Sequence, residues 1–249
     1  MIYRLIEEEN YNAAMNMAID HSLYLSSASS KIPTIRFYRW LNDSISLGAY
    51  QSNNDINLES CGKKGIDVVR RMTGGGAVFH SNSDFTYSFI APIKIFQNDI
   101  EHAYRQITSP IISTLNELGM DASLQRKNDI MVQGKKISGN AAKLMNKGIY
   151  LQHGTLVYGL DIKSISECMN LDKELAKAKM TSISKCRSIP RSKVLSKLRG
   201  RFLCGKEFEI SALTNDELNR AKELAKDRYS RLDAEQGTRL VNKGICYIQ

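Results

Sequence analysis

Residues 70–80 read RRMTGGGAVFH, a stretch that joins two arginines, three consecutive glycines and a run of strand-forming residues. Glycine lets a backbone come close to a ligand because it carries no Cβ. The neighbouring guanidinium groups of Arg70 and Arg71 suit a carboxylate or a phosphate. A strand at 77–80 excludes both a dinucleotide fingerprint and a P-loop, which need a helix there. We expect the glycines to form a tight strand-to-strand turn along a bound anion; an ordinary hairpin loop is the alternative.

The composition of the chain is that of an ordinary soluble globular protein. Its 249 residues, 42% of them hydrophobic and 24% charged, fit one large domain. The formal net charge of +9 favours anionic partners such as a nucleotide or an acidic protein. The lysines are spread out and not grouped with aromatic residues, so nucleic acid is not an expected partner. No apolar run has the length of a signal peptide or a membrane span, so we expect a cytoplasmic protein without membrane contact.

The cysteines are scattered and odd in number, with no Cys-x-x-Cys pair: Cys61, Cys168, Cys186, Cys204 and Cys246. Neither a disulfide framework nor a zinc site is therefore expected. Reduced thiols in a cytosol are the simplest interpretation.

The predicted elements indicate an α+β fold, with a mixed β-sheet flanked by helices. Helices are expected at 12–25, 101–118, 191–199 and 215–229, the second with Pro110 inside it and the last with Thr214 or Asn215 as its N-cap. Strands are expected at 2–6, 34–40, 44–50, 68–71, 77–80, 85–90, 129–132, 136–141 and 149–157. The strands at 34–40 and 44–50 are predicted to pair with each other around a turn at 42–43. We expect a main domain at 1–190 and a helical C-terminal extension of the same domain, exposed on the surface, at 191–249.

A second motif, KNDIMVQGKKISGN at 127–140, predicts a hairpin that turns at Gly134. Alternation along a strand would place Lys136, Ser138 and Asn140 on one face. A lysine held there can stabilise charge on the oxygens of a phosphate-activated acyl group. Asp129 can hold Mg²⁺, which prefers carboxylate oxygens together with phosphates and water. The alternative is a charged hairpin tip with a surface ion pair.

A third motif, IYLQHGTL at 149–156, places His153 inside an apolar strand next to Gly154. Such a histidine is either a hydrogen-bonded core residue or close to a ligand that touches the Gly154 backbone.

Taken in order, RR-x-x-GGG-x-V-x-H, ND-I with G-x-K-I-S-G, and HGTL resemble the lipoate–protein ligase A family of the biotin/lipoyl protein ligase superfamily. The resemblance spans roughly residues 2–186 and implies the mixed sheet flanked by helices that the elements also indicate. It implies an ATP-dependent lipoate–protein ligase working in two steps. Lipoate and MgATP give lipoyl-AMP and pyrophosphate, and a lysine of a lipoyl domain then takes the lipoyl group and releases AMP.

The resemblance assigns Lys136 to catalysis and Asp129 to Mg²⁺, with ATP and Mg²⁺ as cofactors and lipoate as substrate. It implies substrate or nucleotide binding by Arg70, Arg71, Gly74, Gly75, Gly76, Ala77, His80, Asn128, Asp129, Ser138, Gly139, His153, Gly154 and Thr155. The expected partners are lipoyl domains of a 2-oxoacid dehydrogenase E2 or the glycine cleavage H protein. An apolar tunnel for the acyl tail is expected from the strand faces around Phe37, Leu47, Val78 and Phe89.

Three departures from the family pattern stand out. Ser81 replaces the aspartate that usually follows the histidine, so the role of that acid is either absent or taken by Asp84. The segment 181–187 differs from the family's S-V-R-S-R-V, which leaves the roles of Lys185 and Arg187 open. The chain ends before the C-terminal accessory domain, so it resembles the large subunit of a bipartite ligase, and we expect adenylation to need a separate small accessory subunit.

Three rival functions remain open. An octanoyltransferase or lipoyl amidotransferase needs a thiol beside Lys136, but no cysteine lies between Cys61 and Cys168, and Cys168 lacks a Pro-Cys-Gly setting. A biotin ligase normally has G-R-G-R-x-G-R, which is missing here. A non-catalytic lipoyl-binding homologue is the third. The sequence decides neither the preference between lipoate and octanoate nor the acceptor protein or the oligomeric state.

Overall fold

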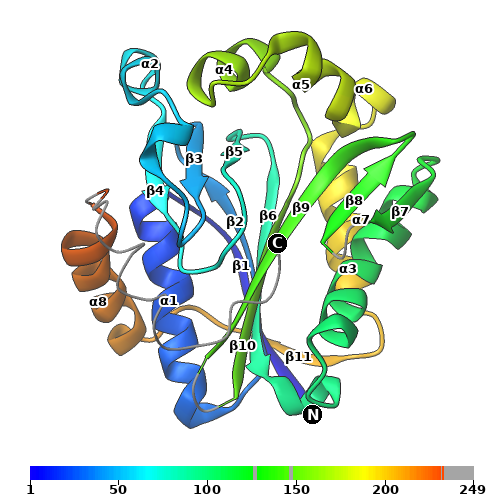
Figure 1. Cartoon of the computed structure of the whole chain (residues 1–249). Helices are drawn as coiled ribbons and strands as arrows, with labels where there is room; N and C mark the ends of the chain where they lie inside the picture. Colours follow the sequence, from blue (N-terminus) through cyan, green and yellow to red (C-terminus); the bar gives the residue numbers. More distant parts are fainter. Residues whose placement is uncertain (126–127, 146–147, 231, 233–249) are drawn as a thin grey trace.

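The protein is built around one large mixed sheet, seen in a computed structural model that describes residues 1–125, 128–145, 148–230 and 232 (Figure 1). The strand order of this eight-stranded sheet is β11-β1-β2-β6-β10-β9-β8-β7. Its strands are β1 (Ile2–Tyr11), β2 (Thr34–Trp40), β6 (Phe85–Pro92), β7 (Ala122–Gln125), β8 (Asp129–Val132), β9 (Lys135–Met145), β10 (Ile149–Leu156) and β11 (Glu207–Ile210). The predicted α+β class with a mixed sheet flanked by helices is confirmed.

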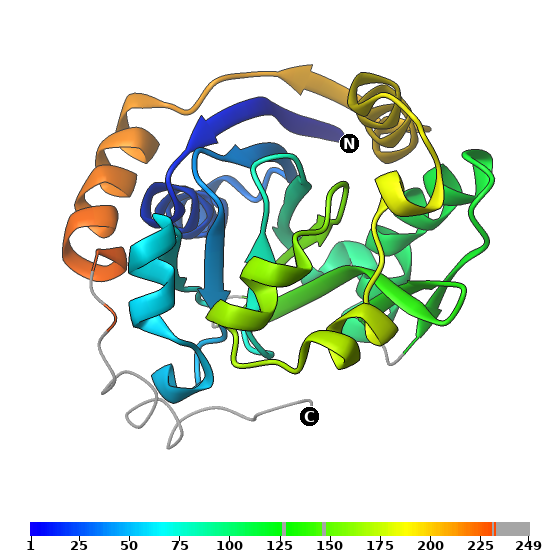
Figure 2. The same cartoon turned by 90° about the horizontal axis from the view of Figure 1, so that it is seen from above.

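Helices cover both faces of this sheet (Figure 2). One face packs against α1 (Ala13–Ser30), on which α8 (Asn215–Leu224) and the π-helix η3 (Ala225–Tyr229) lie. The opposite face packs against α3 (Ile100–Glu117) and α7 (Arg191–Leu203). The shorter helices are η1 (Asn53–Asp55), α2 (Leu58–Lys64), η2 (Ile93–Phe96), α4 (Ile162–Cys168), α5 (Lys173–Lys179) and α6 (Ile183–Cys186). No helix in the described ranges is long and apolar enough to cross a membrane.

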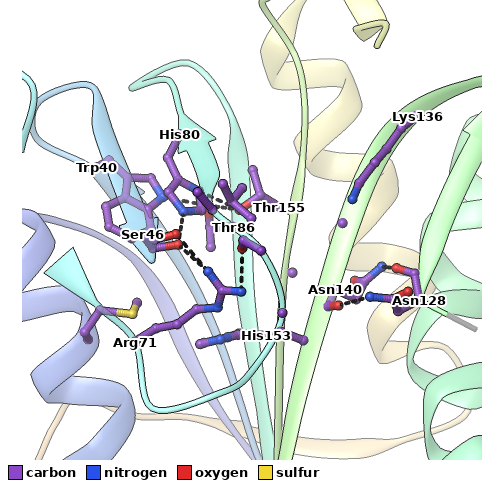
Figure 3. A pocket seen from close by; sticks show the side chains of 18 of the residues that line it. Trp40, Ser46, Arg71, His80, Thr86, Asn128, Lys136, Asn140, His153 and Thr155 are labelled. Atoms are coloured by element: carbon purple, nitrogen blue, oxygen red, sulfur yellow. Dashed lines mark hydrogen bonds between the residues drawn. The ribbon is translucent and has the colours of Figure 1, made fainter. Parts of the chain in front are cut away.

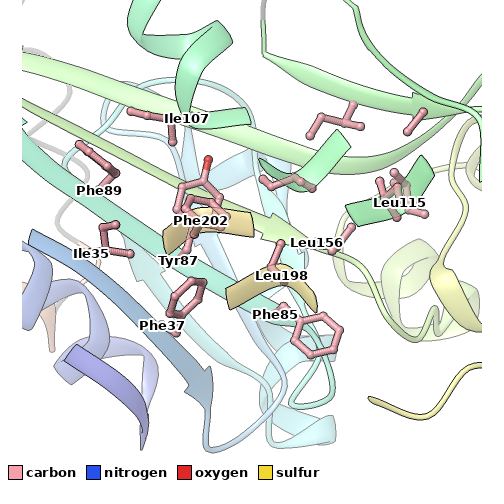
Figure 4. Close-up of a cluster of buried hydrophobic side chains, with 14 of the residues drawn as sticks. Ile35, Phe37, Phe85, Tyr87, Phe89, Ile107, Leu115, Leu156, Leu198 and Phe202 are labelled. Atoms are coloured by element: carbon pink, nitrogen blue, oxygen red, sulfur yellow. The ribbon is translucent and has the colours of Figure 1, made fainter. Parts of the chain in front are cut away.

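The main hydrophobic core lies between the sheet and the α3/α7 layer (Figure 4). Phe37 and Tyr87 from the sheet meet Phe202 of α7, with ring centroids 5.4 Å and 5.0 Å apart. Ile111 and Leu115 of α3 are fully buried against the same cluster. The apolar repeat that predicted the 101–118 helix is thus its packing face, and the helix continues through Pro110.

A second, three-stranded sheet has the order β4-β3-β5 and contains the glycine motif. Its members are β3 (Ser44–Leu47), β4 (Asp67–Arg70) and β5 (Val78–His80). The predicted pairing of 34–40 with 44–50 is wrong, because β1 and β6 occupy both edges of β2. The glycines form no tight hairpin either: β4 runs parallel to β3 and β5 antiparallel to it, so residues 71–77 cross over the end of β3.

The first helix after residue 190, α7, is part of the main core and not a surface tail. Three residues of α7 (Val194, Leu198 and Phe202) are at most 2% exposed and belong to the main core. The sequence did not indicate β11, which adds a parallel edge strand next to β1. Thr214 is the N-cap of α8 and forms a capping box with Glu217, which resolves the choice between Thr214 and Asn215. The chain beyond residue 232 lies outside the described residues.

The β8–β9 hairpin has the predicted turn but not the predicted alternation. Gln133 and Gly134 take positive φ values of 50° and 74°, which glycine at the second position permits. Ile130 pairs with Ser138 while Met131 pairs with Lys136, so Ile137 is an extra residue on β9. This β-bulge shifts the alternation by one residue. Lys136 therefore shares the Gly139 face, not the face of Ser138 and Asn140, and that part of the prediction is wrong.

Candidate active site

A pocket opens on the α1 side of the sheet, between the glycine loop and the strands β9 and β10 (Figure 3). The structure brings together on its walls eleven of the residues named from sequence: Arg71, Gly75, Gly76, Ala77, His80, Asn128, Lys136, Gly139, His153, Gly154 and Thr155. Four others lie outside the lining: Arg70, Gly74, Asp129 and Ser138. Three motifs far apart in sequence thus meet at one place.

Lys136 stands at the pocket edge with its side chain 39% exposed. Its Nζ lies 2.6 Å from Oδ1 of Asp129, across the β8–β9 ladder. The aliphatic stem lies over Gly139, where an added Cβ would come within 3.0 Å of the lysine Cε. Because Gly139 has no side chain, it leaves the space that the Lys136 side chain occupies. The ion pair therefore lies at the edge of the pocket and not at an isolated hairpin tip.

Arg71 is buried beneath the glycine loop and donates its hydrogen bonds to other groups of the protein. Its Nε donates to Thr73 Oγ1 at 3.1 Å, and Nη1 donates to the carbonyl and hydroxyl oxygens of Ser46 at 2.8 Å and 3.2 Å. Nη2 donates to the carbonyl oxygens of Gly74 and Gly76 at 2.6 Å and 2.9 Å. A guanidinium has five N–H donors, and these five bonds use all of them. Arg71 lines the pocket, but its donors hold the loop and leave none for an anion.

Burial lowers the pKa of Arg71 to about 10, which still leaves it charged at neutral pH. The loop that it holds is also packed tightly from below by Gly48. A Cβ on Gly48 would lie 1.8 Å from the carbonyl oxygen of Gly75, so the loop needs a glycine there too. Gly75 itself has a φ of 92°, a conformation that side chains disfavour.

Arg70 has a different role from its neighbour. Successive strand residues point to opposite faces, and Arg70 reaches behind the loop to donate to the carbonyl oxygens of Gly48 and Gln51 at 2.8 Å and 2.6 Å. It also bonds the side chain of Asn53. The predicted joint anion site of two arginines is therefore not formed, because one guanidinium faces the 48–53 segment and the other is saturated by the loop.

His80 forms a flat wall of the pocket together with Trp40. Their rings stack with centroids 4.1 Å apart, and the Trp40 indole N–H donates to Thr86 Oγ1 at 2.9 Å. The ring nitrogens of His80 lie 2.8 Å from Ser46 Oγ and 3.0 Å from Thr155 Oγ1. Burial, with the charge of Arg71 nearby, holds the pKa of His80 well below its ordinary value. His80 is therefore a neutral, polar wall at physiological pH.

His153 is both a hydrogen-bonded core residue and part of the pocket wall, so the two interpretations of it hold together. Its Nε2 lies 2.6 Å from Thr73 Oγ1, and its Nδ1 lies 3.1 Å from Oδ2 of Asp20 on α1. The sequence gave no reason to single out Asp20, which is 133 residues away from His153.

Asp20 is the centre of a buried polar cluster on the α1 side of the sheet. Its Oδ1 accepts from Arg36 Nη1 at 2.9 Å and from Ser88 Oγ at 2.6 Å, and its Oδ2 accepts from Tyr38 Oη at 3.2 Å. Burial by itself would raise the pKa of Asp20, but the hydrogen bond from His153 and the charge of Arg36 outweigh it and lower that pKa. Asp20 is therefore an ionised carboxylate with four donors around it.

The Asn128 side of the pocket is held from the opposite face of the sheet. The amides of Asn128 and Asn140 each donate to the other's backbone carbonyl, at 3.0 Å and 2.9 Å. Tyr87 Oη donates to Asn140 Oδ1 at 2.7 Å. A Cβ on Gly154 would come within 2.1 Å of that same Oδ1. The absence of a side chain at Gly154 therefore leaves room for the Asn140 amide that accepts this bond.

Ser138 faces away from the pocket and is fully buried on the core side of β9, because the β-bulge at Ile137 shifts the alternation of side chains. Asp84 also lies outside the lining. Its Oδ2 accepts from the Ser81 backbone N–H at 2.9 Å and its Oδ1 from that of Tyr158 at 2.8 Å. Burial raises the pKa of Asp84 to about 7, although these bonds oppose the shift. Asp84 therefore ties the turn after β5 to the end of β10 and does not supply a pocket acid in place of Ser81.

The apolar part of the pocket comes from different strand faces than expected. Of the four predicted tunnel residues only Val78 lines it, because Phe37 and Phe89 face the α3/α7 core and Leu47 packs into a third cluster. The lining residues that were not expected to shape it are Met17, Tyr38, Trp40, Ser46, Thr86, Asn140 and Ala141. Tyr38 and Trp40 lie two residues apart on β2, an alternation that does not reveal which face meets the pocket.

None of the thiols in the described residues lines the pocket. Cys61 and Cys168 are at most 1% exposed within a separate cluster between α2 and α4. Burial raises the pKa of Cys61 to about 12 and also raises that of Cys168. Cys186 lies 3.4 Å from Thr181 Oγ1, and Cys204 follows α7. Cys246 lies outside the described residues.

No group of three or more metal-ligating side chains occurs in the described part of the chain. Asp129 offers a single carboxylate beside the pocket. Mg²⁺ in nucleotide sites uses one or two carboxylates together with phosphates and water. The donor set therefore fits an ion carried in by a nucleotide, not a metal held by the protein alone.

The fold and the site together define a class. The model of the lipoyl protein ligase A/B catalytic domain matches residues 12–201. The chain therefore belongs to this family, which confirms the resemblance drawn from the motifs. It is an enzyme of the lipoate ligase and octanoyltransferase family.

The relatives of this chain include both an octanoyltransferase and lipoate–protein ligases. The chain is 28% identical over 267 residues to octanoyltransferase LipM of Brevibacillus brevis, covering 92% of this chain and 96% of the relative. It superposes with a TM-score of 0.83 and 26% identity on a chain from a structural analysis of a bi-partite lipoate protein ligase and its E2 lipoyl domain from Thermoplasma acidophilum, covering 99% and 100% of the two chains. A lipoate-protein ligase A bound with ATP also gives 0.83, at 28% identity and with 95% and 99% coverage.

Proposed function

We propose that this chain is the large, catalytic subunit of a bipartite ATP-dependent lipoate–protein ligase. The observation that carries the proposal is that Lys136 stands at the pocket edge while none of the described thiols reaches the pocket. A ligase of this kind needs cations around an acid and a triphosphate, and a transferase needs a nucleophilic thiol.

The shape of the pocket suits an acid with an oily tail. The labelled side chains of Trp40 and His80 lie on one side of the pocket and those of Lys136 and Asn128 on the other (Figure 3). The aromatic side offers apolar surface to an aliphatic chain and its ring. Lys136 offers an ammonium to the carboxylate and to phosphate oxygens. In the first step a carboxylate oxygen attacks the α-phosphorus of ATP, the bond to the β-phosphate oxygen breaks, and pyrophosphate leaves.

Lys136 stabilises the negative charge that builds on the α-phosphate and acyl oxygens in that step. Asp129 would hold Mg²⁺ together with the phosphates, where the ion neutralises charge on the triphosphate. In the second step the ε-amine of a lysine on a lipoyl domain attacks the acyl carbon, and AMP leaves. The ligase bound with ATP, and the lipoylation system made of a bi-partite ligase and its E2 lipoyl domain, support these two substrates.

The bipartite arrangement is supported by the match to the bi-partite lipoate protein ligase. The T. acidophilum relative is covered completely by this chain. We therefore expect the purified chain to adenylate lipoate weakly or not at all until a small accessory subunit is added. Robust adenylation by the chain alone would refute this part of the proposal.

Octanoyl transfer is the second candidate, because an octanoyltransferase aligns over more than nine tenths of this chain. That activity runs through a cysteine thioester. The two most buried thiols, Cys61 and Cys168, have raised pKa values, which disfavours the thiolate that must attack. Incubation with octanoyl carrier protein, followed by intact-mass measurement, tests this candidate: an octanoyl adduct on a cysteine supports it and displaces the ligase proposal.

The deciding assay combines the purified chain, lipoate, ATP and an apo lipoyl domain, with and without a candidate small subunit. Pyrophosphate release reports the first step, and the mass of the lipoyl domain reports the second. We expect both signals, dependent on ATP. Lipoylation from an acyl carrier protein without ATP would contradict the proposal. Binding of lipoate without pyrophosphate release, even with the small subunit, would indicate a non-catalytic homologue.

A further inference from the structure

A continuous chain of hydrogen bonds runs from α1 through β10 to the glycine loop. It begins at Asp20, passes through His153 Nδ1 and Nε2 to Thr73 Oγ1, and continues to Arg71 Nε, with separations of 3.1 Å, 2.6 Å and 3.1 Å. Arg71 Nη2 then holds two carbonyl oxygens of the loop. Each of these four residues is at most 6% exposed.

The direction of each bond follows from counting protons. The ionised Asp20 carboxylate only accepts, so the proton lies on Nδ1 of His153. When the ring carries only the proton on Nδ1, Nε2 is an acceptor and the Thr73 hydroxyl donates its proton to it. The lone pairs of Thr73 Oγ1 are then turned toward the N–H of Arg71 Nε, which has no acceptor function of its own.

At the glycine loop, these hydrogen bonds determine which backbone groups face the pocket. The carbonyls of Gly74 and Gly76 point toward Arg71. The described chain contains no cis peptide bond, and in a trans peptide the carbonyl and the following N–H point in opposite directions. The N–H groups of Gly75 and Ala77 therefore point away from Arg71, and both residues line the pocket.

We propose that Asp20, His153 and Thr73 are positioning residues that act through Arg71 to fix the orientation of the Gly74–Ala77 peptides against the substrate. The proposal rests on the ligase function for its kinetic readout. These residues do not touch the reacting atoms. The charge of Asp20 fixes one tautomer of His153, and that tautomer fixes the direction in which the Thr73 hydroxyl proton points. A buried carboxylate on α1 is thereby connected to a loop in a different sheet.

Thr73→Val tests the hydroxyl directly, because valine keeps the shape and removes the bonds. A misplacement of about 1 Å costs on the order of 100-fold in rate, so we expect kcat for acyl-adenylate formation to fall roughly 10- to 100-fold, with a smaller change in KM for the acid. Thr73→Ser retains the hydroxyl and should restore kcat to within about threefold. The matched control is Thr114→Val on α3, which removes an equally buried hydroxyl bond to Pro110 and should leave kcat unchanged.

The outcomes are separated by measuring urea unfolding of each variant. A Thr73→Val protein that folds like the Thr114→Val control but keeps wild-type kcat would overturn the proposal. Loss of activity that Thr73→Ser fails to restore in a folded protein would also overturn it, because a hydroxyl would then not be the group that matters.

A readout independent of activity is the tautomer of His153, observed by long-range ¹H–¹⁵N NMR. We expect protonated Nδ1 and bare Nε2 in the wild type, and a change of tautomer with faster amide exchange at Gly75 and Ala77 in Asp20→Asn. A proton on Nε2 in the wild type would make His153 the donor to Thr73, which would overturn the proposal. If the wild type shows this tautomer but no adenylation with any small subunit, the proposed function fails while the positioning chain stands.

Discussion

Lys136 Nζ lies 2.6 Å from Asp129 Oδ1 at the edge of a pocket whose opposite side is the stacked pair Trp40 and His80. The pair exists because one extra residue on β9 turns Lys136 to the face of Gly139. An ammonium and a carboxylate side by side give the same edge a group for phosphate oxygens and a group for a divalent cation.

Lys136→Ala should abolish acyl-adenylate formation while the protein stays folded. Removing one preorganised charge donor typically costs about 100- to 1,000-fold in kcat, and the side chain is too exposed for its loss to leave a cavity. Pyrophosphate release in the presence of lipoate measures the effect. Lys135→Ala is the matched control, because its Nζ bonds the Lys177 carbonyl and lies outside the pocket lining. A near-normal adenylate yield in Lys136→Ala would remove this residue from catalysis.

Asp129→Ala should weaken the dependence of the first step on Mg²⁺. The concentration of Mg²⁺ that gives half-maximal rate should rise by roughly tenfold, because one of the few carboxylate ligands of the ion is lost. Titration of Mg²⁺ at fixed ATP measures it. Asp121→Ala, an exposed acid before β7, serves as the control. An unchanged metal response would mean that Asp129 only pairs with Lys136.

Gly48→Ala should displace the glycine loop. The added methyl would lie 1.8 Å from the Gly75 carbonyl oxygen, so the loop must move. Overpacking of this kind costs about 1–3 kcal/mol of unfolding free energy, and activity should fall with it. Gly62→Ala in α2 is the control: its Cβ meets nothing within 4 Å, and it should stabilise by about 0.5–1 kcal/mol. Equal stability and activity in both variants would contradict the tight packing beneath the loop.

His21 should make the protein acid-labile. Burial, with the charges of Arg228 and Lys143, lowers its pKa from 6.5 to about 4. Well above pH 6.5 the residue is neutral in both states and has no effect. As the pH falls toward 4, the unfolded chain takes up a proton that the folded chain refuses, so stability drops by on the order of 3 kcal/mol.

Urea unfolding of wild type and His21→Gln between pH 7.5 and roughly 4 measures this loss. The variant keeps a polar side chain facing Tyr229, whose hydroxyl lies 3.1 Å from His21 Nδ1. We expect the difference in stability between the two proteins to change across this window. Parallel curves would show that His21 titrates alike in the folded and unfolded states.

Several elements follow directly from local sequence. The apolar repeat of α3 indicated its packing face, and Gly134 marked the hairpin turn. The three motifs indicated most of the pocket walls, because glycines and a strand-borne lysine leave local signals. Pairing between strands was less accessible: nothing in 34–50 shows that β2 is already paired on both edges. The strands β7 and β11 are short and carry no clear alternation, and neither was indicated.

Sequence by itself determined the family, the α+β class and the types of chemical group that gather at the site. Tertiary structure decided how those groups are used. Arg71 has the composition of an anion ligand, yet the surrounding carbonyls and hydroxyls take all five of its donors. Asp20 is an ordinary acid in a helix until the fold places it against His153. The physical reason is that residue type fixes what a side chain can donate or accept, whereas only packing fixes which partner is within reach.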